Sequence, residues 1–136
     1  MKARIFIGMV ALVVAAVGCS PTGNGDAAAE KVFSAKTEPL VGRWVRPDGG
    51  YTLMVSRGEP EGRLRASYFN PNPIRVSAVR ASVDGDAVKL FVELNDEGYP
   101  GCTYNLTYDK AKDQLVGVYF QAAMQESYKI SFERAP

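Results

Sequence analysis

The stretch SVDGDAVKLFVELND, residues 82–96, contains the two signals that decide the fold of this chain. In its second half, Val88, Leu90 and Val92 share one parity, and charged residues lie on the other. Alternation of this kind predicts a β-strand with one buried face. The preceding DGD supplies the aspartate and glycine that tight hairpin turns require. The stretch therefore predicts two antiparallel strands joined by a turn.

The same pattern continues from Leu40 to the C-terminus. Eight strand candidates alternate with turns rich in glycine, proline, asparagine and aspartate, at residues 40–46, 51–56, 63–69, 74–83, 87–94, 103–108, 115–121 and 127–134. Strands joined by such short loops pair with their neighbours in the chain. Closing the sheet removes its two open edges. We therefore expect an all-β domain over residues 40–136, an eight-stranded antiparallel up-and-down barrel, with a two-sheet β-sandwich as the alternative.

Alternation also assigns the faces of these strands. The inward parity is mostly large and aliphatic, and it includes Val116 and Val118 in the seventh candidate. Such an interior favours a filled core over a deep cavity. In residues 74–83 the apolar phase slips near Ala78 and Val79, which predicts a β-bulge.

Two short motifs carry a family resemblance. The opening strand contains Gly42 and Trp44 in the segment LVGRW, and the last strand ends with Arg134. This layout resembles the calycins, the superfamily of lipocalin and avidin barrels. The resemblance implies that Gly42 permits close packing and that Arg134 lies over the Trp44 indole as a cation–π pair. The residues that avidins use for biotin are not matched, so biotin binding is not implied.

In an up-and-down barrel, Trp44 and Arg134 lie at one end, and an aromatic group collects at the other. We expect this second end to be a mouth with candidate ligand-binding residues Tyr51, Tyr68, Asn70, Tyr104, Phe120 and Tyr128. An inward tyrosine needs a hydrogen-bond partner for its hydroxyl. The mouth therefore either binds a small apolar or amphipathic ligand or is simply plugged by its own tyrosines.

The N-terminus predicts a location. Lys2 and Arg4 precede an apolar run of about 14 residues, too short for a bilayer-spanning helix of roughly 20. The run ends in AVGC, which resembles the lipobox of bacterial lipoproteins. The resemblance implies a signal peptide over residues 1–18, a lipid such as palmitate on Cys19, and an envelope location facing the periplasm or exterior, at the outer membrane if the cell is Gram-negative.

Residues 19–39 then predict a flexible tether, in which DAAAEKVFSAK favours a turn or two of helix. A further run, YFNPNPI, also looks like part of a family of small uncharacterised bacterial lipoproteins, which implies no function.

Composition argues against several classes of function. The chain has no histidine and a net charge of +1, so we expect no enzyme, no cofactor, no metal site and no nucleic-acid partner. With Cys19 acylated, Cys102 lacks a partner and is expected to be buried and inert. Residues 40–80 contain seven arginines against three acids, whereas residues 81–136 contain five basic and nine acidic residues.

Two functions fit this sequence. One is a lipid-anchored barrel that binds a small ligand or an envelope component at its mouth. The other is a structural or interaction lipoprotein whose filled barrel presents its outer surface to a protein partner.

Overall fold

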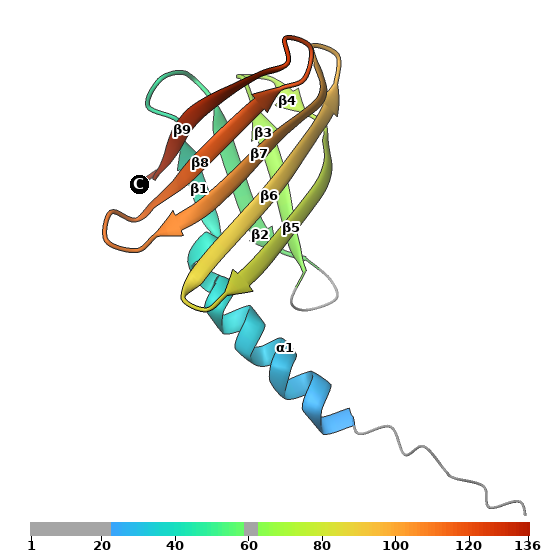
Figure 1. The fold of residues 1–136 in the computed structure, drawn as a ribbon, viewed down its shortest axis with the longest axis vertical. Helices are drawn as coiled ribbons and strands as arrows, with labels where there is room; N and C mark the ends of the chain where they lie inside the picture. Colours follow the sequence, from blue (N-terminus) through green and yellow to red (C-terminus); the bar gives the residue numbers. More distant parts are fainter. Residues whose placement is uncertain (1–22, 59–62) are drawn as a thin grey trace, which may run out of the picture.

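A computed structural model describes residues 23–58 and 63–136 of the chain. Within these residues a helix and a short 3₁₀ turn precede nine strands (Figure 1). The elements are α1 (Gly23–Thr37), η1 (Glu38–Leu40), β1 (Gly42–Val45), β2 (Thr52–Arg57), β3 (Leu64–Phe69), β4 (Pro73–Ile74), β5 (Val76–Asp84), β6 (Ala87–Asp96), β7 (Tyr99–Asp109), β8 (Gln114–Gln121) and β9 (Glu126–Arg134).

The strands form one antiparallel sheet that curls into a nearly closed barrel. The strand order is β4-β3-β2-β1-β9-β8-β7-β6-β5, and β1 meets β9 where Trp44 lies opposite Arg134. The prediction of an all-β antiparallel barrel is therefore confirmed, and β1 is the strand that pairs with the last strand, β9. All the described strands belong to this single sheet, so the chain does not adopt the alternative two-sheet sandwich.

The barrel stays open along one side, between β3 and β5, and it contains nine strands rather than eight. The strand expected over residues 74–83 divides at Arg75 into β4, which pairs with β3, and β5, which pairs with β6. The β5–β6 register shifts between Val76 and Ala78, which confirms the expected bulge. No ladder joins β5 to β3 in their described residues, although Cα atoms of the two strands come within 8 Å of each other.

Apolar side chains fill the interior, as the sequence predicted. The largest fully buried side chains include Trp44, Tyr68, Tyr104, Phe132 and Leu115. They form one continuous core with the smaller aliphatic residues. Burying each large side chain contributes about 1.5–3 kcal/mol, so this core is the main source of stability of the barrel.

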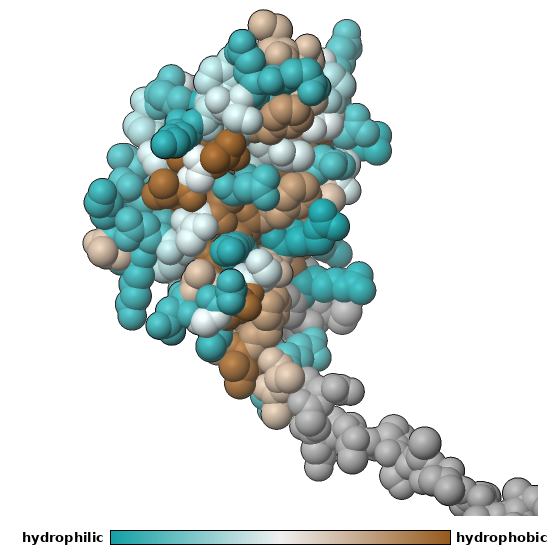
Figure 2. All heavy atoms as spheres, viewed as in Figure 1, coloured by the Kyte–Doolittle hydropathy of each residue, from teal (hydrophilic) through white to brown (hydrophobic). Residues whose placement is uncertain are grey.

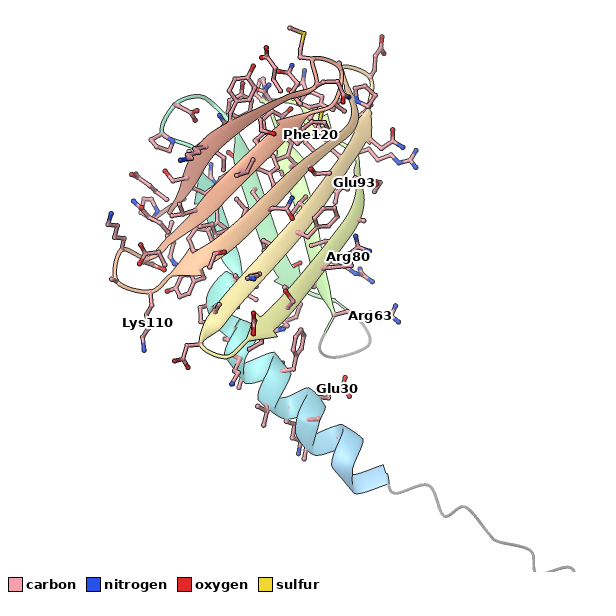
Figure 3. The ribbon with its side chains drawn as sticks, viewed as in Figure 1. Glu30, Arg63, Arg80, Glu93, Lys110 and Phe120 are labelled. Carbon is pink, nitrogen blue, oxygen red and sulfur yellow. The ribbon has the colours of Figure 1, made fainter. Side chains whose placement is uncertain are left out.

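The faces of β8 are opposite to the prediction. Val116 and Val118 are 42% and 37% exposed, so they face solvent. Phe120 shares their parity and lies on the outside of β8 at the loop end of the barrel (Figure 3). Gly117 takes the inward position, where a Cβ atom would lie 1.8 Å from the carbonyl oxygen of Asn105. Both alternating sets of residues in β8 are apolar, so alternation alone did not show that the set containing Gly117 faces inward.

A helix replaces most of the predicted flexible tether. The segment AAAEK within residues 23–37 has high helix propensity, and the last turn docks on the barrel. Arg57 of β2 donates to the Thr37 hydroxyl at 3.0 Å and pairs with Glu38 at 2.9 Å. Arg57 also donates to the Ser34 carbonyl, where a cation is favoured by the helix dipole. These tertiary contacts orient α1 against the barrel.

The end of the barrel next to α1 is closed by Trp44 and Arg134. Trp44 is fully buried and donates to the Leu40 carbonyl at 2.9 Å. The guanidinium of Arg134 lies 4.2 Å from the centre of the indole and is paired with Asp113 at 2.7 Å. Gly42 has φ +144°, and a Cβ atom there would lie 2.5 Å from Nη1 of Arg134. The geometry predicted for Gly42, Trp44 and Arg134 is thus present.

Candidate functional site

The opposite end of the barrel collects most of the aromatic side chains that the sequence placed there. Figure 1 shows the loops of this end lying far from α1. Tyr68 on β3 and Tyr104 on β7 point inward and are 1% and 0% exposed. Tyr51, just before β2, packs against the core from the β1–β2 loop. We call this group, with the residues that bond to it, the mouth.

A chain of hydrogen bonds crosses the mouth from the interior to solvent. The hydroxyls of Tyr68 and Tyr104 lie 2.8 Å apart, and Arg46 donates to the Tyr104 oxygen at 2.9 Å. Arg46 is 8% exposed and also forms a two-pronged ion pair with Asp48, with an Nε–Oδ1 distance of 2.8 Å. Each buried polar side-chain atom in the described residues has a partner. The hydroxyls predicted to need partners therefore find them within the protein.

The electrostatics of the mouth favour this closed arrangement. Burial raises the pKa of Tyr68 and of Tyr104, so both phenols are neutral at physiological pH. Burial alone would lower the pKa of Arg46, but Asp48 and Tyr104 raise it above the ordinary arginine value. Arg46 in turn lowers the pKa of Asp48. The buried cation is therefore both charged and paired, as burial of a charge requires.

Aromatic rings pack around the guanidinium of Arg46. Its carbon lies 4.4 Å from the ring centre of Tyr51 and 5.8 Å from that of Tyr119. The rings of Tyr104 and Tyr119 are 4.7 Å apart, and those of Tyr51 and Tyr68 are stacked at 6.3 Å. Aromatic pairs at these separations stabilise one another beyond simple burial. The mouth is therefore a packed cluster rather than an open cup.

The rim of the mouth holds the remaining predicted residues. Asn70 donates to the Tyr99 hydroxyl at 2.5 Å, and Tyr99 packs edge-on against Tyr68 at 6.3 Å. Tyr128 is 42% exposed and stacks on Tyr119 at 6.5 Å. In the structure, the side chain of Asn70 thus connects the β3–β4 loop to Tyr99 through a hydrogen bond.

The expected mouth residues are only partly brought together. Phe120 lies outside, so its predicted inward position was wrong. The sequence interpretation also missed Arg46, Asp48 and Tyr119. Arg46 lies two residues after Trp44 and shares its inward parity, which is the signal that could have revealed it.

Cys102 is fully buried and has a free thiol, as expected. Within residues 23–58 and 63–136, no group of three or more histidine, cysteine or acidic residues is placed to hold a metal ion. The helix in this part of the chain is not long and apolar enough to span a membrane. Cys19 and the segment before it lie outside the described residues.

Comparison with protein-family models, curated proteins and solved structures finds no match to this chain.

Proposed function

We propose that this chain is an envelope lipoprotein, held to a membrane through an acylated Cys19, whose barrel is a non-enzymatic module for binding a protein partner. Support for the anchor comes from the basic flank, the apolar run and the small residues before Cys19. Two or three acyl chains on one cysteine bind a membrane durably, because each buried methylene contributes about 0.8 kcal/mol.

In this proposal the helix α1 is a stalk between the lipid anchor and the barrel. It begins four residues after Cys19, and its 15 residues give a length of about 22 Å. Its last turn docks against the barrel through Arg57. Such a stalk presents the mouth and the sides of the barrel at a distance from the lipid.

The choice of a protein partner over an internal ligand depends on one observation, the filled mouth. Tyr68 and Tyr104 are buried, bonded to each other, and capped by the Arg46–Asp48 pair. Binding sites for small molecules are concave and lined with unfilled space, whereas a ligand here would have to displace this cluster. The outer surface is therefore the better candidate for recognition.

That outer surface has a chemically distinct side. On β8 the exposed Val116 and Val118 lie opposite Thr107 and Asn105 of β7, and opposite Ser131 and Lys129 of β9, which gives a partly apolar face. Figure 2 shows apolar side chains among hydrophilic ones on this view of the barrel. The side formed by β3 and β5 is instead rich in arginine. Charge complementarity between such a face and the surface of a partner determines which partners associate and how fast they do so.

The anchor is tested by changing Cys19→Ala in the full chain and following its membrane fractionation and its labelling with palmitate. We expect labelling and membrane association to be lost. The matched control is Cys102→Ala, because Cys102 is the other cysteine and is buried in the core. Membrane association that survives Cys19→Ala would show that lipidation does not hold the protein there.

The binding mode is tested with protein purified from its own membrane. Native mass spectrometry should show the mass of the lipidated chain alone. A photo-crosslinking residue at position 65, on the arginine-rich side, should capture a protein that one at position 129, on β9, does not. A co-purifying small molecule that is lost from a Tyr68→Ala, Tyr104→Ala variant would instead support a ligand at the mouth.

A further inference from the structure

The outer face of β1, β2 and β3 carries an exposed apolar side chain at its centre. These three strands lie behind β7 and β8 in Figure 1. Met54 of β2 is 47% exposed, more than any other large apolar side chain in the described strands. Its register partners are Arg43 on β1 and Ser67 on β3. Met54 therefore projects from the middle strand of this face and not from a loop or a sheet edge.

Arginine side chains flank Met54 on both sides. Arg43 lies directly opposite it on β1, which places the two Cβ atoms about 4.5–5.5 Å apart. Arg65 on β3 is the register partner of Ser56, so it lies diagonal to Met54 at about 7–8 Å. Both arginines are exposed, and neither forms an ion pair with a described residue. A single surface that covers Met54 can therefore contact both guanidinium groups.

The composition of this face is that of a protein contact. The outward residues of the three strands are arginine, methionine, serine, threonine, valine and phenylalanine, with no acid among them. An acid on the next strand, Glu133 of β9, lies opposite Val45 at the border of the face. Residues 37–88 contain no lysine, so the cations here are arginines. Protein interfaces are enriched in arginine and methionine and depleted in lysine.

We propose that the outer face of β1–β3 is the docking surface for the protein partner, and that the partner presents carboxylates around an apolar pocket that accepts Met54. This assignment rests on the proposed function and names the surface and the chemistry of the partner. Arginine can bond one carboxylate through two parallel N–H groups, so carboxylates over Arg43 and Arg65 fix the orientation of the partner. The unbranched side chain of Met54 adapts to the shape of a pocket.

A second copy of this chain does not fit this face as a two-fold dimer. Two-fold symmetry brings the same surface of both copies together. Arg43 and Arg65 of one copy would then meet the same arginines of the other, and like charges across an interface repel. A head-to-tail contact between copies would instead build rings or filaments. An acidic surface of a different protein is therefore the occupant that matches the charge of this face.

The experiment places the photo-crosslinking residue p-benzoylphenylalanine at position 54 of the full lipidated chain in its own membrane. We expect it to capture a protein, and mass spectrometry of the cross-linked peptide should find the attachment site in a segment rich in aspartate and glutamate. Capture should fall as salt is raised, because salt screens exposed charges. The same residue at position 118, where Val118 is 37% exposed on β8, is the control and should not capture that protein.

Two charge reversals test the role of the arginines. With the cross-linking residue at position 54, Arg65→Glu should reduce capture about tenfold or more, because the new carboxylate repels the acidic segment. Lys129→Glu makes the same change at an exposed position of β9 and should leave capture unchanged. Urea unfolding followed by the fluorescence of Trp44 shows whether both variants remain folded.

The apolar contact is tested with the captured protein, purified and labelled. Fluorescence anisotropy measures its affinity for the full chain in phosphatidylcholine nanodiscs. Met54→Ala should weaken binding about tenfold, because a side chain that fills a pocket at the centre of an interface contributes a large share of the binding energy. Val118→Ala, a truncation of an exposed apolar side chain on β8, should leave the affinity unchanged.

Several outcomes would overturn the proposal. They are the absence of capture at position 54, capture through a segment without acidic residues, and equal loss of capture in Arg65→Glu and Lys129→Glu. Capture of a second copy of this chain, or of phosphatidylglycerol in place of a protein, would assign the face to self-association or to the membrane and would also overturn it.

Failure of this assignment is distinguishable from failure of the proposed function. Arg65 also lines a hollow between β3 and β5, so a cross-linking residue at position 65 reaches a neighbouring surface as well. A protein captured at position 65 but not at position 54 would reject this docking surface and retain the proposed function. Absence of capture at both positions would reject the two together.

Discussion

Replacing Arg46 with methionine tests whether the hydrogen bonds and the ion pair made by its guanidinium stabilise the filled mouth. The substitution Arg46→Met keeps an unbranched side chain but removes the guanidinium. The lost hydrogen bond from a charged donor to buried Tyr104 costs about 1.5–3 kcal/mol. The lost cation–π contact with Tyr51 adds about 0.5–1 kcal/mol. The ion pair with half-exposed Asp48 contributes little, so we expect a loss of about 3 kcal/mol in the free energy of unfolding.

Urea unfolding followed by tryptophan fluorescence measures this loss. Trp44 is the single tryptophan and is fully buried, so its emission reports on the barrel core. The matched control is Arg43→Met, at an exposed position of the same strand, which should change stability by less than about 0.5 kcal/mol. A double-mutant cycle with Tyr104→Phe should give a coupling energy of at least about 1 kcal/mol.

Two results would refute this reasoning. The first is a loss in Arg46→Met no larger than that in Arg43→Met, which would mean that the guanidinium does not stabilise the mouth. The second is a Tyr104→Phe substitution that costs the same with Arg46 present or absent. In either case the mouth would no longer be described as closed by its own residues, and a ligand there would become the stronger proposal.

Two further predictions concern the ends of the barrel. Gly42→Ala should lower the free energy of unfolding by about 1–3 kcal/mol, because φ is +144° and the new Cβ meets Arg134; Gly50→Ala, with open space around it, is the control in the same urea titration. Stability should also fall as pH rises above about 10, where phenols ionise in the unfolded chain, because burial raises the pKa of Tyr68 and Tyr104 and the folded protein retains their protons. Each such tyrosine contributes a slope of up to about 1.4 kcal/mol per pH unit, so Tyr68→Phe should show a shallower decline, and an unchanged slope would contradict the assignment.

The sequence predicted the general course of the strands well, because alternation and turn chemistry are local. The Asp-Gly-Asp turn joins β5 to β6 as expected, and the alternation around Leu90 occurs in β6. It failed in β8, where both parities are apolar and the choice of face depends on how closely β7 approaches Gly117. The sequence also underestimated the length of α1, because the contacts of Arg57 with the last turn of that helix come from a distant strand.

By itself, the sequence determined an all-β barrel whose ends differ, with an indole at one end and phenols at the other. Only the tertiary structure decided that the phenols face one another and Arg46 instead of an empty mouth, because hydrogen-bond partners 36 and 58 residues apart in the chain meet only after folding. It also decided that the barrel stays open between β3 and β5, since sheet closure depends on the cumulative twist and bend of all the strands and not on any one of them.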